Sequence, residues 1–153
     1  MENLIISSPC FEHGGLIPVE HTGYGADHSP ELILHGLTKA AVSTAILMND
    51  MGHPISAYNH WIIWNIPPTA VIPGKIPPGR SVSSLGGAMQ GLGYGKHQYR
   101  GPKPPFNWSH VYDYNVFVLD CFLDLPDRAK KKDLLNAMQG HILQQAVLSG
   151  HYR

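Results

Sequence analysis

Short apolar runs, separated by glycine and proline, recur along the whole chain. Four runs rich in β-branched and aromatic residues lie at Leu4 to Ser7, Val42 to Met48, His60 to Ile66 and Tyr112 to Leu123. Runs of this length and composition, bounded by turn-forming residues, predict β-strands. The run from Trp61 to Ile66 is apolar on both faces before Pro67 ends it. This pattern predicts a strand buried between two layers, and hence a sandwich.

A helical pattern is confined to the C-terminal part of the chain. The apolar positions that recur there at spacings near three and four are Leu134, Leu135, Met138, Ile142 and Leu143. Asp127 can cap this run, and Gly140 is expected to divide it in two. The expected fold is therefore mostly β, a sandwich with one or two C-terminal helices packed at one edge.

Composition favours one folded domain over residues 1–153. The 13 prolines and 16 glycines are spread along the chain with no linker-like cluster and no repeat. With 43% hydrophobic and 14% charged residues, the chain is expected to be compact rather than disordered. Eleven basic residues balance eleven acidic ones, so no net field attracts a polyanion. This balance argues against nucleic acid as a partner.

A cytoplasmic location is expected, with no stable membrane association. Residues 1–11 lack a basic region followed by a sustained apolar run, and later apolar runs fall far short of the roughly 18 residues of a membrane span. Nothing amphipathic and basic offers a membrane-facing surface. Cys10 and Cys121 lie too far apart for a zinc-ribbon spacing, and both are expected to be reduced.

The common catalytic motifs do not occur in the sequence. GxxxxGK[ST], a GxGxxG that opens a helix, HExxH, CxxC and GxSxG are all absent. The glycine-rich segment Gly91 to His97 precedes no helical pattern and is expected to form a bent strand or a turn. Cys121 is interpreted as a small buried hydrophobe. No cofactor, metal ligand or catalytic residue is therefore assigned.

Three polar residues mark the ends of predicted apolar strands: Asp50, His60 and His110. Strand ends are where a rigid scaffold presents side chains to a ligand. If the three converge, they could bind a metal as a facial triad, act as acid and base in hydrolysis, or hydrogen-bond to a phosphate. Alternatively, each histidine simply satisfies a buried backbone group, which spacing alone favours. The histidines expected at the surface or in turns are 13, 21, 28, 35, 97 and 151.

Seven segments stand out along nearly the whole chain. They are SSPCFEHGGLIP at 7–18, HSPEL at 28–32, DMGHP at 50–54, NHWIIWNIP at 59–67, GYGKHQYRGPKPP at 93–105, HVYDYNVFVLD at 110–120 and LLNAMQGHILQQAVLSGHY at 134–152. In this order they resemble the phosphatidylethanolamine-binding protein family, in particular its bacterial Raf-kinase-inhibitor-like branch. The resemblance implies an antiparallel β-sandwich of Greek-key type with C-terminal helices, and a small pocket for phosphate or a phosphorylated head group.

The resemblance also implies a set of ligand-binding positions. Matched by motif, these are Asp50, His60, Gly101, Pro102, Pro104, Pro105, His110 and Tyr112. Met51 and Gly52 depart from the family's pattern, which has a proline and a second aspartate at these places. Losing a carboxylate suggests that the site favours a dianionic phosphate over an ammonium-bearing head group. His53 is a candidate for adding a pH-dependent positive charge nearby.

The leading expectation is a non-enzymatic module that binds a phosphate-like anion or a phosphorylated small molecule. One alternative, by family analogy, is an inhibitor or scaffold that binds a kinase or a protease. A more remote one is a metal-dependent or acid–base hydrolase built on Asp50, His60 and His110, for which no nucleophile can be named. Bacterial relatives suggest a homodimer.

Overall fold

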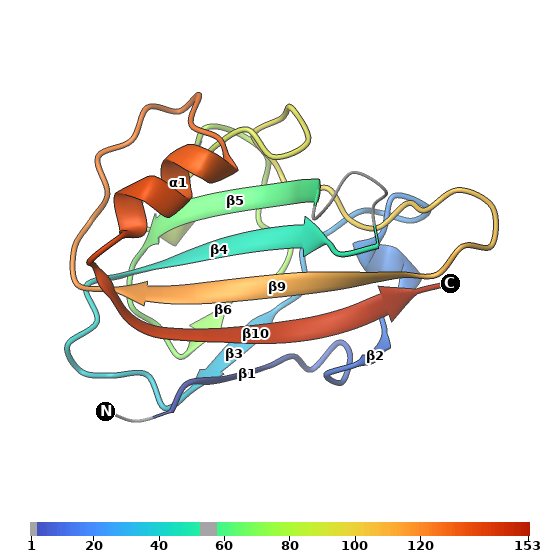
Figure 1. Cartoon of the computed structure of the whole chain (residues 1–153), viewed down its shortest axis with the longest axis horizontal. Coiled ribbons are helices and arrows are strands. Elements are labelled where there is room, and N and C mark those ends of the chain that lie inside the picture. Colours follow the sequence, from blue (N-terminus) through green and yellow to red (C-terminus); the bar gives the residue numbers. More distant parts are fainter. Residues whose placement is uncertain (1–2, 53–57) are drawn as a thin grey trace.

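Two β-sheets form the body of the protein (Figure 1). The computed structural model describes residues 3–52 and 58–153. The spatial order of the larger, seven-stranded sheet is β2 (Gly15–Leu16), β10 (Ile142–Tyr152), β9 (His110–Leu119), β4 (Ser43–Asp50), β5 (Tyr58–Ile66), β8 (Ala88–Gln90) and β7 (Ser81–Val82). The order of the smaller, three-stranded sheet is β1 (Ile5–Ser7), β3 (Leu32–His35) and β6 (Val71–Ile72).

The central strands of the larger sheet have the Greek-key order. Strands β4, β5 and β8 lie side by side in chain order, and β9 returns to pair with the other edge of β4. These pairings are antiparallel, whereas the short β2 runs parallel to β10. The predicted antiparallel β-sandwich is thus confirmed, with one short parallel pair added.

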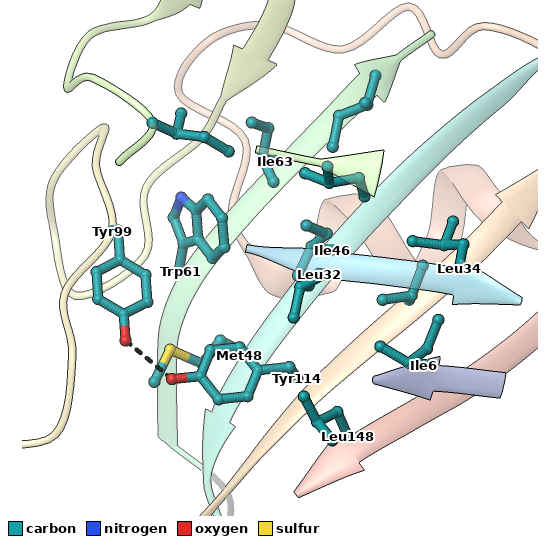
Figure 2. Close-up of a cluster of buried hydrophobic side chains, with 14 of the residues drawn as sticks. Ile6, Leu32, Leu34, Ile46, Met48, Trp61, Ile63, Tyr99, Tyr114 and Leu148 are labelled. Atoms are coloured by element: carbon teal, nitrogen blue, oxygen red, sulfur yellow. Dashed lines mark hydrogen bonds between the residues drawn. The ribbon is translucent and has the colours of Figure 1, made fainter. Parts of the chain in front are cut away.

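Both faces of the larger sheet are covered. Side chains alternate between the faces of a strand, so each central strand supplies two hydrophobic clusters. Figure 2 shows the first cluster, in which the small sheet packs on the large one through Ile6, Leu32, Leu34, Ile46, Met48, Trp61 and Ile63. The second cluster lies under helix α1 (Lys131–Met138) and contains Ala45, Leu47, Ile62, Trp64, Phe117, Leu134 and Met138. The two-sided apolar pattern of Trp61 to Ile66 follows from this double cover.

The four predicted strands are confirmed, with shifted ends. The largest shift is at β9, which begins at His110 and ends at Leu119 rather than at Leu123. Cys121 therefore lies just beyond the strand and is half-buried, not a fully buried strand residue. Both cysteines are free, as expected.

The helical prediction is right for the first half of the C-terminal run and wrong for the second. Helix α1 is the one α-helix in the described part of the chain, and Ile142 and Leu143 belong to β10 instead. Gly140, with φ of 81°, turns the chain out of the helix. Beyond it, β10 pairs with β9 along its whole length. From Gln144 onward the inward positions recur every second residue, a strand period that outweighs two apolar residues at helical spacing.

Asp127 is not the helix cap. Lys130 occupies the N-cap position, and its backbone N–H donates to the Asp133 carboxylate at 2.9 Å. Asp127 pairs instead with Arg80, at 3.4 Å. No helix in the described residues has the length and hydropathy that a membrane crossing requires.

A β-bulge at Asn65 fastens the sheet to the segment that leads into the helix. Two residues of β5, Trp64 and Asn65, oppose one residue of β4 at this point. Asn65 has a left-handed φ of 59°. Its side chain accepts from the Leu123 N–H at 2.7 Å and donates to the Leu123 carbonyl at 2.9 Å. The bulge therefore anchors the chain after β9 as well as bending β5.

We expect Asn65→Ala and Asn65→Gly both to lower the free energy of unfolding, by about 1–3 kcal/mol, because both leave the Leu123 backbone groups without their side-chain partner. Alanine is usually the more stabilising of the two residues, but here the left-handed backbone penalises its Cβ. The glycine variant should therefore be at least as stable as the alanine variant in urea unfolding. An alanine variant that is clearly the more stable would contradict the role of the bulge.

Candidate functional site

Three strand ends meet at one end of the larger sheet, the end at which Figure 1 draws the arrowhead of β4. Asp50 is the last residue of β4 and His110 is the first residue of β9. The ladder pairs Asp50 with Tyr112, which lies two residues from His110 and therefore on the same face. The register of β4 with β9 thus places a carboxylate, an imidazole and a phenol side by side.

His60 reaches this group because of a second β-bulge. Met48 pairs with Trp61 and Asn49 pairs with Asn59, so His60 is the extra residue of β5. Bulges of this kind re-aim a side chain that regular alternation would send to the other face. The His60 Nε2 atom lies 3.9 Å from Asp50 Oδ2.

Asp50 is buried and its carboxylate is well supplied with donors. His110 Nδ1 lies 2.8 Å from Oδ2 and 3.1 Å from Oδ1, and the Gly52 N–H donates to Oδ1 at 2.9 Å. Buried carboxylates need such partners to remain ionised. Because Nδ1 of His110 carries the donated hydrogen, its Nε2 is the ring nitrogen left for a ligand.

The protonation state of His60 follows from its own contacts. Its Nδ1 lies 2.8 Å from the Arg100 carbonyl, which can only accept, so Nδ1 carries the hydrogen. Burial lowers the pKa of His60 below its ordinary value of 6.5, against the opposing effects of the Arg100 hydrogen bond and the Asp50 charge. At neutral pH the ring is therefore uncharged, and Nε2 presents a lone pair.

The proline-rich loop forms one wall and is fastened from behind by the segment 21–27. The three hydrogen bonds that join them are Gly101 N–H to Asp27 Oδ1 at 2.8 Å, Gly23 N–H to Pro102 O at 2.8 Å and Tyr24 O–H to Pro104 O at 2.6 Å. Prolines limit the backbone of the loop, and these bonds fix where it lies. The wall is therefore held in place before any ligand arrives.

Gly101 is needed because two segments approach it closely. A Cβ atom at this position would lie 2.0 Å from the His21 carbonyl oxygen and 2.6 Å from Asp27 Oδ1. A larger residue would push the wall away from the segment 21–27. His21 itself was expected at the surface or in a turn, but it is buried in the short helix η1 (Val19–His21). Its Nδ1 donates to the His28 carbonyl at 2.8 Å.

Together these groups enclose a pocket of about 120 Å³. Its lining residues are Asp50, His60, Tyr94, Arg100, Gly101, Lys103, Pro104, Pro105, His110 and Tyr112. Seven of the eight residues expected to bind a ligand line this volume. The eighth, Pro102, is buried and does not line it; its carbonyl joins the wall to Gly23. The convergence that the strand ends suggested is therefore present.

Three lining residues were not expected: Tyr94, Arg100 and Lys103. Tyr94 lies in the predicted turn, which a bridge between Gly93 and Lys96 closes. Its ring centroid is 4.9 Å from that of His60, and the Arg100 guanidinium lies 4.2 Å above it. A tyrosine between two glycines, and two basic residues beside the prolines, were the available signals. In this loop the predicted ligand-binding positions were Gly101 and the prolines, without the basic residues beside them.

The two departures from the family pattern have different surroundings. Met51 is exposed and does not line the pocket. A Cβ atom at Gly52 would lie 3.0 Å from His110 Cγ, so any larger residue there would press on the imidazole. Gly52 therefore differs from the family pattern in leaving space beside His110 as well as in lacking a carboxylate. His53, the expected source of extra positive charge, lies outside the described residues.

The pocket residues do not form a compact metal-binding group. In residues 3–52 and 58–153, one set of three His, Cys, Asp or Glu side chains brings its ligand atoms within 4.8 Å of one another. That set lies elsewhere, at Asp120, Cys121 and His141. Asp50, His60 and His110 do not meet this spacing as a set of three.

These features define a β-sandwich protein with a small polar pocket at the strand ends of its larger sheet. The family model described as phosphatidylethanolamine-binding protein matches residues 7–153. The chain belongs to this family.

Known relatives and solved structures agree with this assignment. A UPF0098 protein from Pyrococcus abyssi is 37% identical over 153 residues, which cover 99% of this chain and 86% of that protein. A UPF0098 protein from Methanothermobacter thermautotrophicus is 36% identical over 150 residues, which cover 97% of both proteins. A Chlamydia trachomatis homolog of phosphatidylethanolamine-binding proteins has a TM-score of 0.87 at 28% identity, over 100% of this chain and 99% of that one. Escherichia coli YbcL has the same TM-score at 22% identity, over 99% and 98%, and supports the fold alone. Archaeal and bacterial relatives both match, so the bacterial branch stays a prediction.

We expect the stability of the protein to fall as the pH drops below 6.5, partly because His60 is buried uncharged. Its pKa is lowered on folding, so the unfolded chain binds more protons in this range, and stability present above 6.5 is lost as the pH falls through the folded pKa. One proton contributes a slope of at most about 1.4 kcal/mol per pH unit. Urea unfolding from pH 8 to pH 5 should show a shallower dependence in His60→Asn, which keeps a donor for the Arg100 carbonyl. Equal slopes in the two proteins would contradict this assignment.

Proposed function

We propose that the protein binds a phosphate-like anion or a phosphorylated small molecule in this pocket and does not transform it. The observation that carries the proposal is the convergence of donors and cations on one small volume. Arg100 and Lys103 bring positive charge, Tyr112 brings a hydroxyl, and all three line the pocket. His110 also lines it, and its Nε2 donates when the ring is protonated, because Nδ1 is held by Asp50. Asp50 is the one carboxylate among the described lining residues, and it is already engaged by His110 and Gly52.

The size of the pocket restricts the ligand to a compact group. Its volume of about 120 Å³ lies well below the roughly 300–1,000 Å³ of pockets that enclose drug-sized molecules. A tetrahedral oxyanion suits this space and accepts hydrogen bonds in several directions. The exposed edge of the proline wall and the ring of Tyr94 can hold a short apolar substituent at the mouth.

The uncharged state of His60 adds a condition to binding. A lone pair on Nε2 repels an unprotonated oxyanion, so either the ligand brings a proton or His60 takes one up. Binding of an anion raises the proton affinity of a nearby imidazole. Anion affinity is therefore coupled to proton uptake and rises as the pH falls.

Calorimetry with inorganic phosphate should show affinity that rises between pH 8 and pH 6. Sulfate, which does not protonate in this range, should show the same trend, because His60 then supplies the proton-binding group. We expect His60→Asn to reduce this pH dependence and His110→Asn to bind both anions about tenfold or more weakly, since a hydrogen bond from the protonated His110 Nε2 to an anion contributes about 1.5–3 kcal/mol. His97→Asn, outside the pocket, is the control. Wild-type affinity in both pocket variants would refute the proposal.

A series at Gly52 tests whether the missing carboxylate decides the choice of ligand. Gly52→Ala, Gly52→Asn and Gly52→Asp all place a Cβ atom against His110, but only the last adds charge. We expect the aspartate variant to bind phosphate roughly tenfold more weakly than the asparagine variant, because like charges a few ångströms apart near a surface repel appreciably. Phosphoethanolamine, which carries an ammonium group, should lose less. Equal phosphate affinity in the Asp and Asn variants would rule out the electrostatic explanation.

The binding of a kinase or a protease remains a family analogy. No contact among the described residues identifies such a partner.

A further inference from the structure

A second cluster of reactive side chains lies at the opposite end of β9 from the pocket. Asp120 directly follows the strand, Cys121 comes next, and His141 precedes β10. In Figure 1 this is the end at which the arrowhead of β9 is drawn, below helix α1. The three ligand-type atoms of these side chains lie within 4.8 Å of one another.

The backbone holds the three residues in place. The Asp120 N–H donates to the His141 carbonyl at 3.0 Å, where the ladder of β9 with β10 begins. The Ser43 hydroxyl donates to the Cys121 carbonyl at 2.6 Å, which ties this residue to the start of β4. The cluster therefore lies at the ends of paired strands and is held by their hydrogen bonds, as a site of defined geometry requires.

The side chains already contact one another. His141 Nδ1 donates to Asp120 Oδ1 at 2.8 Å, and the Cys121 sulfur lies within 4.8 Å of ligand atoms of both residues. Asp120 and His141 are about half exposed, so both can rotate and solvent can reach them. A tetrahedral metal ion with ordinary bond lengths separates its ligand atoms by about 3.3–3.8 Å. Small side-chain rotations are enough to replace this hydrogen bond with metal bonds.

We propose that Asp120, Cys121 and His141 form a binding site for a divalent transition metal ion of the zinc type. One thiolate, one imidazole and one carboxylate are a ligand set that zinc accepts, and the thiolate disfavours calcium and magnesium. Three protein ligands leave the fourth tetrahedral position for water. On binding, a metal–sulfur bond forms and the Cys121 thiol proton passes to solvent.

Metal binding at this site would close the connection formed by residues 122–140, which contains α1. The ligands come from the two ends of this connection, so the metal joins the chain before the helix to the chain after it. A ligand that binds only the folded state stabilises it in proportion to its concentration and affinity. The proposed site is thus a structural clip, independent of the pocket at the other end of the sheet.

Cobalt(II) reports on this site directly, because a cobalt–thiolate bond gives an intense near-ultraviolet absorption. Titration of the metal-free full chain should give a saturable one-to-one signal, displaced by zinc. Cys121→Ser should abolish the absorption, while Cys10→Ser, the matched control at the other cysteine, should keep it. We expect Asp120→Asn and His141→Asn to weaken binding by about tenfold or more. Zinc should raise the melting temperature of the wild type and of Cys10→Ser but not of Cys121→Ser.

The proposal is overturned if no saturable cobalt–thiolate absorption appears, or if the signal persists in Cys121→Ser. Visible cobalt absorption that is lost in His110→Asn but kept in Cys121→Ser and His141→Asn would place the metal in the pocket and would equally overturn it. Circular dichroism of each variant separates loss of binding from loss of the fold. His141→Asn and Asp120→Asn change exposed side chains and provide the test if Cys121→Ser does not fold.

Discussion

The pairing of β4 with β9 is the constraint on which the candidate pocket depends. Asp50 lies opposite Tyr112 in this ladder, and His110, two residues before Tyr112, lies on the same face. A slip of one residue would turn one strand's side chains to the face covered by α1 and separate the carboxylate from the imidazole. The register is held because Ile46, Met48 and Tyr114 bury their side chains against the smaller sheet (Figure 2). Core packing thus sets the geometry of polar groups at the strand ends.

Burial then determines the chemistry of those groups. A carboxylate at the edge of a hydrophobic core needs donors, and Asp50 obtains them from His110 and Gly52. The same burial lowers the pKa of His60, whose hydrogen is committed to the Arg100 carbonyl. In each imidazole, therefore, Nδ1 is hydrogen-bonded within the protein and Nε2 is the nitrogen left for a ligand. The protein itself fixes the direction of both rings, which would reduce the entropy lost on binding of the proposed anion.

Sequence patterns predicted the parts of this arrangement that are local. The two-sided apolar run of β5 indicated a sandwich, and the positions of Asp50 and His110 at strand ends indicated a shared edge. The bulge that re-aims His60 could not be predicted, because it depends on how two strands fit together rather than on either alone. The hydrogen bonds from the segment 21–27 to the proline wall are equally non-local. The strand at Ile142 was missed because two apolar residues matched a helical spacing, whereas long-range pairing with β9 decided the outcome.

Different polar groups lie at the two ends of β9: the pocket residues at His110 and the cluster at Asp120. Along its length β9 is hydrogen-bonded to β4 on one side and to β10 on the other. Coupling between distant sites requires an element with two alternative arrangements. A strand that is paired on both edges cannot shift to a second register without exposing its buried face. We therefore expect that β9 would not transmit occupancy of the proposed pocket at His110 to the cluster at Asp120. The strand acts as a rigid support for two separate candidate sites. Each lies where the chain leaves the sheet, so its polar groups are not committed to pairing with a neighbouring strand.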